Sequence, residues 1–259
     1  MEQTPISVVK IGGNVVDNPE ALRAFLADFA AMKGPKVLIH GGGKEATRLS
    51  KALDIPTVMV EGRRVTSLET LHVVTMVYAG LINKRIVSLL QSLGCDAVGL
   101  SGADGNAIPA TRRPPQPVDF GYVGDIDHER INSQFILSLI DSGRVPVFCA
   151  ICHDTHGTLL NCNADSVAAS VARGLVSRPV SLTFCFKMPG VMTDVERPDS
   201  VIPVMTPALF DTMRANGSVA KGMVPKLQNA IRCAQAGVDV RICDAKALLT
   251  PDSGTRIAI

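Results

Sequence analysis

The sequence has 259 residues, of which 46% are hydrophobic and 19% charged, and its net charge is +2. A chain of this length can bury its core as one large domain or as two modest lobes. The near-neutral charge argues against nucleic-acid and membrane-surface partners, because nothing supplies the long-range field that either would use.

Six apolar runs, bounded by glycine or turn residues, recur along the chain. They predict buried strands at 6–11, 36–40, 96–100, 145–151, 180–184 and 239–243. The segments between them predict helices at 19–32, 44–53, 67–92, 131–142, 163–175, 206–215 and 222–236. Strands that are apolar on both faces are typical of a sheet covered by helices on each side. We therefore expect an α/β protein, an open α/β/α sandwich with a largely parallel central sheet.

Two segments interrupt this alternation. The stretch 107–127 is rich in proline and glycine and predicts a hairpin with a mobile tip at 112–117. It could close over a bound substrate, as lids do where water must be excluded. The stretch 176–181, VSRPVS, marks a change from helix to strand. We expect a boundary there between an N-terminal lobe, 1–177, and a C-terminal lobe, 178–259.

Export and membrane insertion are not indicated. No apolar run approaches the ~20 residues of a membrane span, and the first residues lack the basic and apolar regions of a secretory signal. The seven cysteines are an odd number scattered through apolar segments, which argues against a disulfide framework and favours a reducing cytoplasm.

Glycines follow the first two expected strands. In VVKIGGN, Lys10 lies near the end of a strand and precedes Gly12 and Gly13; in HGGGKEA, glycines 41–43 precede a helix. Such loops let backbone N–H groups approach an anion, and a helix N-terminus adds positive potential. Neither loop has the Walker A or the G-x-G-x-x-G spacing. Together they predict an anion site at the carboxyl ends of the strands, although either loop alone could be only a tight turn.

Arg64 and the helix after it are a further candidate site. Arg64 precedes Ser67, which can cap the helix expected at 67–92, and its guanidinium could bind a carboxylate or could simply be a solvated charge. The helix is apolar around much of its circumference. This favours a subunit contact, with burial inside the monomer as the alternative. The residues concerned are Leu71, Val74, Val77 and Leu81.

Cys149, Cys152 and His153 have the C-x-x-C-H spacing of a haem c attachment signal. A haem or metal redox site that also uses His156 is therefore a rival interpretation. Cys149 lies in an expected strand, however, where alternate side chains face opposite sides of the sheet, and small cysteines are common in buried strands. We expect no metal site from these residues.

Eight segments occur together in a specific order and spacing: VVKIGGN, HGGG, GRRVT, GLSGADG, FGYVGDI, NCNAD, GMVPKLQNA and GTRI. In these the chain resembles the N-acetylglutamate kinases of the amino acid kinase family over nearly its whole length. The resemblance implies transfer of the γ-phosphoryl group of ATP, with Mg²⁺, to the side-chain carboxylate of N-acetylglutamate, giving N-acetylglutamyl 5-phosphate in arginine biosynthesis. It also implies an N-terminal lobe for the amino-acid substrate, a C-terminal lobe for the nucleotide, and a homodimer.

The same resemblance assigns roles to individual residues. Lys10 and Lys226 are the transition-state lysines, and Asp165 orients them. The residues that the resemblance implies for acyl-glutamate binding are Gly42, Gly43, Arg64, Asn161 and Asn163. ATP binding falls to Gly12, Gly13, Lys187 and Gly190. Asn163 can equally cap the helix that follows it, and no side chain is assigned to a metal.

The chemistry agrees with this assignment. A glutamate side chain has a reference pKa of about 4.3, so the acceptor is already an anion at pH 7 and needs no general base. The reaction needs positive charge and positioning around the transferring phosphoryl group, which lysines and backbone N–H groups supply. Lys226 lies in the first turn of an expected helix, so its ammonium and the helix terminus can point at one phosphate.

The segment LTFCFKMPGVM departs from the family pattern Leu-Ser/Thr-Asp-Val-x-Gly, with Lys187 where an acid is expected and two extra residues. This leaves the adenine and ribose contacts open, and we interpret 184–186 as an apolar strand. Together with CAICHDTHG it also leaves two alternatives: N-succinylglutamate as the acceptor, and a ligand-binding regulator without catalysis. Retention of Lys10, Asp165 and Lys226 favours an active enzyme. Only five residues precede the first strand, so we expect a dimer that is insensitive to arginine.

Overall fold

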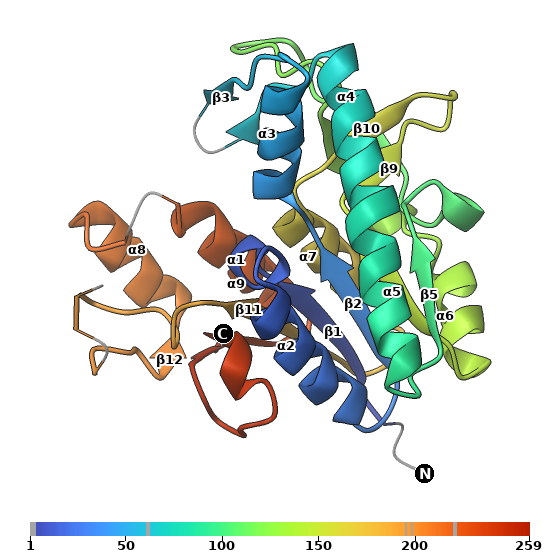
Figure 1. The fold of residues 1–259 in the computed structure, drawn as a ribbon. Coiled ribbons are helices and arrows are strands. Elements are labelled where there is room, and N and C mark those ends of the chain that lie inside the picture. Colours follow the sequence, from blue (N-terminus) through green and yellow to red (C-terminus); the bar gives the residue numbers. More distant parts are fainter. Residues whose placement is uncertain (1–3, 61–62, 195, 198, 220–221) are drawn as a thin grey trace.

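The computed structural model describes residues 4–60, 63–194, 196–197, 199–219 and 222–259. Its centre is an eight-stranded sheet (Figure 1). In spatial order the strands are β12 (Val204–Met205), β14 (Thr255–Ile257), β13 (Asp239–Asp244), β11 (Val180–Phe186), β1 (Ile6–Ile11), β2 (Lys36–His40), β8 (Val145–Cys149) and β5 (Ala97–Leu100). Strands β13 to β5 run parallel, and only the pairing of β14 with β13 is antiparallel. The largely parallel sheet is confirmed, and all six predicted strands belong to it.

Helices cover both faces of the sheet. They are α1 (Gly13–Val16), α2 (Pro19–Ala31), α3 (Gly43–Ala52), α4 (Leu68–Thr75), α5 (Asn83–Ser92), α6 (Ser133–Asp141), α7 (Ala164–Gly174), α8 (Pro207–Ala215) and α9 (Val224–Gln235). On one face α5 packs against β5, β8 and α2; on the other, α7 contacts β1 and β11, and α9 contacts β13 (Figure 1). The predicted sandwich is confirmed, and the seven predicted helices agree with the structure to within two residues at each end. The four-residue helix α1 was not predicted.

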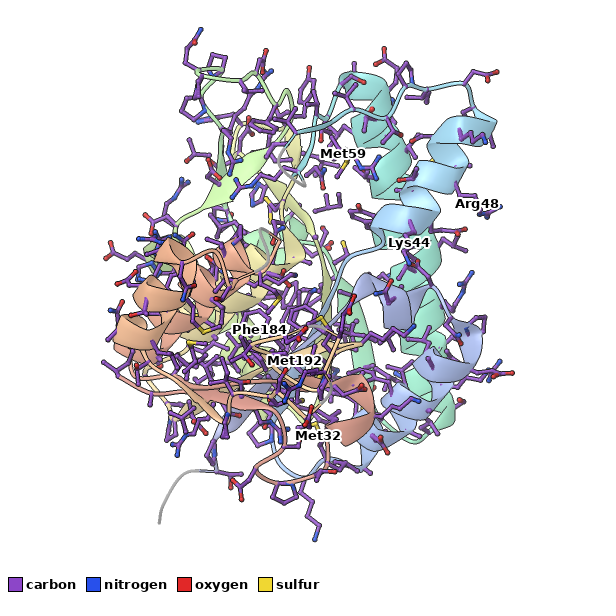
Figure 2. The ribbon with its side chains drawn as sticks, turned by 90° about the vertical axis from the view of Figure 1, so that its left-hand side faces the viewer. Met32, Lys44, Arg48, Met59, Phe184 and Met192 are labelled. Carbon is purple, nitrogen blue, oxygen red and sulfur yellow. The ribbon has the colours of Figure 1, made fainter. Side chains whose placement is uncertain are left out.

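The core explains why these strands have no polar face. Every residue of β2 is buried, as are most of β1 and β11, because helices lie above and below them. Phe184 of β11 is fully buried in the densely packed interior, whereas Arg48 of α3 points outward (Figure 2). The apolar interpretation of this strand is therefore confirmed for Phe184.

Helices α4 and α5 are joined through a π-helical turn, η1 (Met76–Ile82), into one continuous helix, Leu68–Ser92. Its 25 residues are long and apolar enough, by length and composition alone, to cross a membrane, and 44% of its most apolar window is buried in the chain. The expectation that no apolar stretch approaches that length was therefore wrong for this helix. Leu71, Val74 and Val77 are buried within the chain, while Leu81 is exposed.

The order of the strands fixes where a ligand can bind. From β1 the chain crosses to β2 on one side, whereas the strands that follow β11, which are β12, β13 and β14, all lie on the other side. In open α/β sheets such a reversal leaves a crevice beyond the carboxyl ends of the two strands. Lys10 lies near that end of β1, opposite Phe184 of β11.

Three short two-stranded ribbons lie outside the main sheet: β3 (Met59–Val60) with β4 (Arg63–Arg64), β6 (Ala110–Arg112) with β7 (Gly124–Ile126), and β9 (Ile151–His153) with β10 (Leu159–Asn161). The β6–β7 pair confirms the hairpin predicted at 107–127. The segment just before β7 is tied to the start of α4, since Thr66 N–H donates to Phe120 O and Tyr122 N–H donates to Thr66 O.

Candidate active site

A cleft of about 770 Å³ opens at the carboxyl ends of the central strands. Its walls come from β1, the glycine loop 41–43, the β6–β7 hairpin, the start of α7 and the inner side of α9. Seven cationic side chains and two carboxylates line it: Lys10, Arg63, Arg64, Arg113, Arg173, Lys226, Arg232, Asp125 and Asp165. This excess of positive charge makes the cleft a site for anions.

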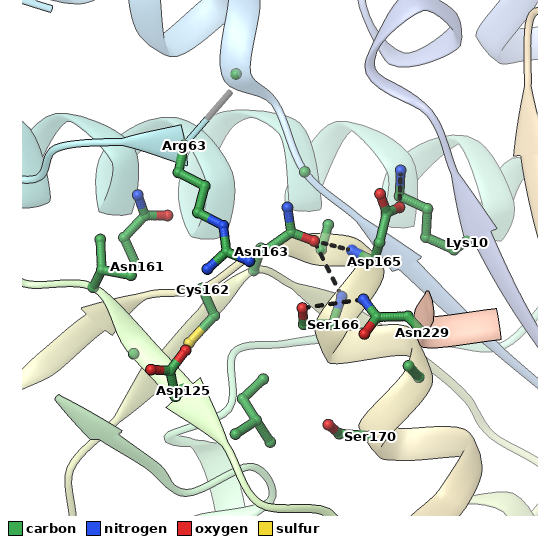
Figure 3. A pocket seen from close by; sticks show the side chains of 18 of the residues that line it. Lys10, Arg63, Asp125, Asn161, Cys162, Asn163, Asp165, Ser166, Ser170 and Asn229 are labelled. Carbon is green, nitrogen blue, oxygen red and sulfur yellow. Dashed lines mark hydrogen bonds and ion pairs between the residues drawn. The ribbon is translucent and has the colours of Figure 1, made fainter. Parts of the chain in front are cut away.

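Lys10, Asp165 and Lys226, which we call the lysine cluster, meet at one point although they are distant in sequence. Lys10 Nζ lies 2.6 Å from Asp165 Oδ1, and Lys226 Nζ makes an ion pair with Asp165 Oδ2. The side chains of Lys10 and Asp165 are only 8% and 7% exposed, and that of Lys226 is 27% exposed. The structure thus brings together the three residues that the sequence assigned to catalysis (Figure 3).

The electrostatics of the lysine cluster follow from this geometry. Burial raises the pKa of Asp165, but the two ammonium groups outweigh it and bring the pKa down to about 2. Burial lowers the pKa of Lys226, while Asp165 opposes that shift. The carboxylate is therefore ionised at any pH near neutral, and it holds two cations whose combined charge exceeds its own.

The glycine loop 41–43 lies beside this cluster at the start of α3. Gly42 is the N-cap residue of α3 and Gly43 its first residue; both line the cleft, and backbone N–H groups at a helix start have no acceptor within the helix. A Cβ on Gly42 would lie 2.2 Å from Ile82 Cδ1, so packing also requires glycine there. Gly13 lines the cleft as well, whereas the Gly12 N–H donates to Cys185 O and is occupied within the sheet.

Arg63, Arg64 and Arg113 form what we call the arginine wall. Arg64 is 9% exposed and donates to Gly43 O at 2.9 Å and to Thr47 Oγ1 at 2.8 Å, both neutral oxygens. Arg113 pairs with Asp125 across the β6–β7 hairpin. Arg63 reaches into the pocket toward Asn163 (Figure 3). The sequence assigned Arg64 to the site but gave no role to Arg63, its neighbour in GRRVT, or to Arg113, which stands in no motif.

Asn161 and Asn163 begin the same segment but are held differently. Asn161 is buried and its Nδ2 donates to Thr66 Oγ1 at 3.0 Å, which joins β10 to the start of α4. Asn163 Oδ1 accepts from the N–H groups of Asp165 and Ser166, so it caps α7 (Figure 3). The capping prediction is confirmed, and both side chains also line the cleft.

His40 and Tyr78 contact the glycine loop, and neither was assigned a role from the sequence, although His40 begins the segment HGGG. His40 is fully buried; its Nδ1–H donates to Gly41 O, and its Nε2 accepts from Asn83. Burial lowers the pKa of His40 to about 4, so it is neutral at pH 7. Tyr78 comes from the π-helical turn and lines the cleft, with burial raising its pKa. His40 directly precedes the loop in the sequence, whereas only tertiary packing brings Tyr78 to it.

Lys187 and Gly190 lie outside the lining of this cleft. Lys187 is exposed just beyond the end of β11. Gly190 is buried, and a Cβ there would lie 2.8 Å from Thr255 Oγ1, so close packing already accounts for a glycine at this position. Their assignment to ATP stays a prediction.

The C-x-x-C-H segment is divided between the main sheet and the β9–β10 ribbon. Cys149 ends β8 in the main sheet, whereas Cys152 and His153 belong to β9. All seven cysteines are buried and free. Within the described part of the chain, no three His, Cys, Asp or Glu side chains are grouped so that they could hold a metal ion.

Comparison with known proteins agrees with this geometry. Residues 5–244 match the amino acid kinase family. The acetylglutamate kinase of Cytophaga hutchinsonii is 47% identical over 245 residues, 93% of this chain and 92% of that protein, and the one of Phocaeicola vulgatus is 46% identical over 97% and 98%. Among solved structures, smu.665 from Streptococcus mutans superposes with a TM-score of 0.79 at 26% identity, covering 98% of both chains. The N-acetylglutamate synthase of Neisseria gonorrhoeae has a TM-score of 0.82 at 23% identity over 99% of this chain and 60% of that one, which shows a shared fold.

The lysine cluster, the glycine loop and the arginine wall thus occur in a chain whose relatives share nearly its full length. The protein belongs to the amino acid kinase family and, within it, to the acetylglutamate kinases.

Proposed function

We propose that this protein transfers the γ-phosphoryl group of ATP to the side-chain carboxylate of N-acetyl-L-glutamate, in arginine biosynthesis in the cytoplasm. The observation that carries the proposal is the buried Asp165, which holds two ammonium groups at the mouth of a cationic cleft. A site that only bound anions would not need a carboxylate between its two lysines.

The residues divide the work of the reaction. An oxygen of the acceptor carboxylate attacks the γ-phosphorus, the bond to the bridging oxygen breaks, and ADP leaves without any proton transfer. Lys10 and Lys226 neutralise the charge that spreads over the phosphoryl oxygens, and Asp165 keeps both in line. The N–H groups of Gly42 and Gly43 hold the acceptor or phosphoryl oxygens at the start of α3.

At the acceptor side, Arg64 and Asn161 bind the α-carboxylate, with Asn163 nearby. Arg64 supports this role because it donates to neutral oxygens and keeps an uncompensated charge. These groups come from residues 1–177, which we propose as the acceptor and dimerisation lobe. Residues 178–259 supply Lys226 and the nucleotide site, where Lys187 and Gly190 join Gly12 and Gly13 around ATP.

For Mg²⁺, unlike for ATP, we assign no binding residue of this chain. The described residues hold no cluster of carboxylates that fits a protein-bound ion. Mg²⁺ usually keeps several waters and binds through substrate phosphates, so we propose that it enters with the nucleotide and neutralises phosphate charge there. The residues of this chain would then contact it only through ATP.

N-succinylglutamate is a second candidate acceptor, and the arginine wall favours it. Arg63 lines the cleft in addition to Arg64, and so does Arg113, which is paired with Asp125, so the lining carries more cations than carboxylates. A succinyl group would place a second carboxylate in the same cleft. A forked guanidinium binds a carboxylate through two hydrogen bonds.

Steady-state ADP release tests these proposals directly. The purified protein is assayed with N-acetylglutamate, N-succinylglutamate and glutamate, and the kcat/KM values rank the acceptors. We expect turnover of an acylated glutamate and little with free glutamate. Absence of turnover with every acceptor would instead indicate the ligand-binding regulator.

We further propose that the protein is a homodimer that associates through the long helix Leu68–Ser92. Leu68, Met76 and Leu81 on this helix are 46%, 54% and 45% exposed, which leaves apolar surface uncovered. Light scattering should give twice the chain mass of 27.4 kDa. Met76→Glu should convert the protein to monomers, and a monomeric wild-type protein would contradict the proposal.

A further inference from the structure

Phe186, the last residue of β11, lies beneath both lysines of the lysine cluster. The centroid of its ring is 5.0 Å from Lys10 Nζ and 4.3 Å from Lys226 Nζ. The ring packs against the turn after β1, where a Cβ on Gly12 would lie 3.5 Å from Phe186 Cδ1. Its other neighbour is the ring of Phe184, stacked at 6.3 Å. Phe186 is only partly buried, so it is not a core residue in the way that Phe184 is.

The lysine cluster has a reason to use such a ring. Two ammonium groups share one carboxylate, so the cluster has a net charge of +1 before a ligand arrives. Burial disfavours the charged form of Lys226, and the neighbouring Lys10 disfavours it further. The face of an aromatic ring carries negative potential without a formal charge, and it attracts ammonium groups within about 6 Å. Phe186 therefore offers both lysines a second partner besides Asp165.

A ring serves phosphoryl transfer better than a second carboxylate would. A second carboxylate would neutralise the cluster, and its ion pairs would compete with the oxygens of the phosphoryl group. The attraction to a ring is weaker than the attraction to a phosphoryl oxygen, so the ammonium groups can turn to the substrate while Asp165 still holds them. Interactions that strengthen only as the transition state forms are those that raise kcat.

We propose that Phe186 is a positioning residue for phosphoryl transfer, which holds Lys10 and Lys226 in place through the face of its ring. The inference rests on the proposed function, because that function assigns the two lysines to the phosphoryl group. It also gives a role to the segment LTFCFKMPG, in which the sequence departs from the family pattern.

A fluorination series tests the ring directly. Phe186 is replaced by 4-fluoro-, 3,5-difluoro- and 3,4,5-trifluorophenylalanine, which weaken the potential of the ring face stepwise with little change of shape. We expect kcat to fall with each fluorine, by about tenfold for the trifluoro ring, while KM for ATP stays within twofold. A flat series in an active enzyme overturns this inference alone. Absence of turnover in the unmodified enzyme overturns the proposed function, and the inference with it.

Substitutions by natural amino acids add a second measurement, the pH dependence of kcat, which would not change if Phe186 were only structural. Phe186→Leu should lower kcat about 10- to 30-fold and move the alkaline limb of the kcat profile to lower pH, because Lys226 loses a partner of its charged form. Phe186→Tyr should keep kcat within threefold. Phe210→Leu is the matched control: Arg214 lies 5.6 Å from that ring in α8, so the variant loses a cation–ring contact outside the cleft and should keep kcat. A raised KM for ATP with unchanged kcat in Phe186→Leu would show that the ring stacks on adenine instead.

Discussion

The lysine cluster and Arg64 of the arginine wall are both cationic, yet they hold their charges in opposite ways. In the lysine cluster, one buried carboxylate binds two ammonium groups. In the arginine wall, Arg64 donates to a carbonyl and a hydroxyl and keeps its full charge. The first arrangement suits charge that moves during the reaction, and the second suits a carboxylate that stays in place. The two regions should therefore respond differently to substitution.

The largest expected effect is at the lysine cluster. Lys10→Met or Lys226→Met should lower kcat by about 10³-fold or more with a small change in KM, because each ammonium acts mainly on the transition state. Steady-state ADP release measures this. Lys246→Met, at an exposed lysine after β13, is the matched control and should leave kcat unchanged. A loss of less than tenfold in either variant would remove that lysine from catalysis.

At the arginine wall the effect should appear in binding. Arg64→Lys should raise KM for the acylated glutamate about 10- to 100-fold and change kcat only a few-fold, since a point charge cannot replace the forked guanidinium. KM for ATP should stay constant and serves as the internal control. If kcat fell as far as KM rose, the contrast between the two regions would fail.

Acid should destabilise the glycine loop and the lysine cluster in separate pH windows. His40, beneath the glycine loop, has a pKa of about 4 when folded and 6.5 when unfolded, so the stability it gives is present above pH 6.5 and is lost as the pH falls toward 4. Asp165, with a pKa lowered from 3.8 to about 2, loses its contribution only below about pH 4. The free energy of unfolding should therefore drop by about 2 kcal/mol between pH 7 and pH 5 through His40.

Urea denaturation at the two pH values measures this drop. His40→Gln should flatten the dependence between pH 7 and pH 5 while leaving the steeper loss below pH 4. An unchanged slope in this variant would show that His40 does not cause it.

The smallest expected effect is at Asn163, which lies between the two regions. Asn163→Ala removes the cap of α7 and should cost about 1 kcal/mol of stability, seen as a fall in Tm of ~2–4 °C. Asn163→Ser keeps a capping oxygen and should restore most of that stability. If KM rose more than tenfold in the serine variant, Asn163 would bind substrate in addition to capping the helix.

Much of the architecture could be predicted because local patterns determine it. Apolar runs of five to seven residues predicted the six buried strands, and the amphipathic segments between them predicted the helices. Failures came where packing decides. The antiparallel strand β14 has three residues and no distinctive pattern, and α1 has only four residues. The helix Leu68–Ser92 is apolar enough to resemble either a membrane span or a core helix, because composition alone does not distinguish burial from exposure.

The candidate site likewise contains residues that sequence motifs identified and residues that only the packing of the chain brings to the cleft. Lys10, Asp165 and Lys226 stood in motifs, so the sequence named them and the structure brought them together. Arg63 stood in the motif GRRVT without an assigned role, whereas Arg113 and Tyr78 stood in no motif. Only the β6–β7 hairpin and the π-helical turn bring Arg113 and Tyr78 to the cleft. The segment 184–186 illustrates the limit: one apolar pattern contains a core ring at Phe184 and a ring beneath two lysines at Phe186.

The sequence by itself determined the α/β alternation, the glycine loops and the identity of the three charged residues that meet in the cleft. Only the tertiary structure decided which cations share a carboxylate, which keep their charge, and which ring lies beneath them. The physical reason is distance along the chain. Periodicity and capping act over a few residues, whereas Lys226 and Asp165 are 61 positions apart and meet only because α7 and α9 pack side by side behind the sheet.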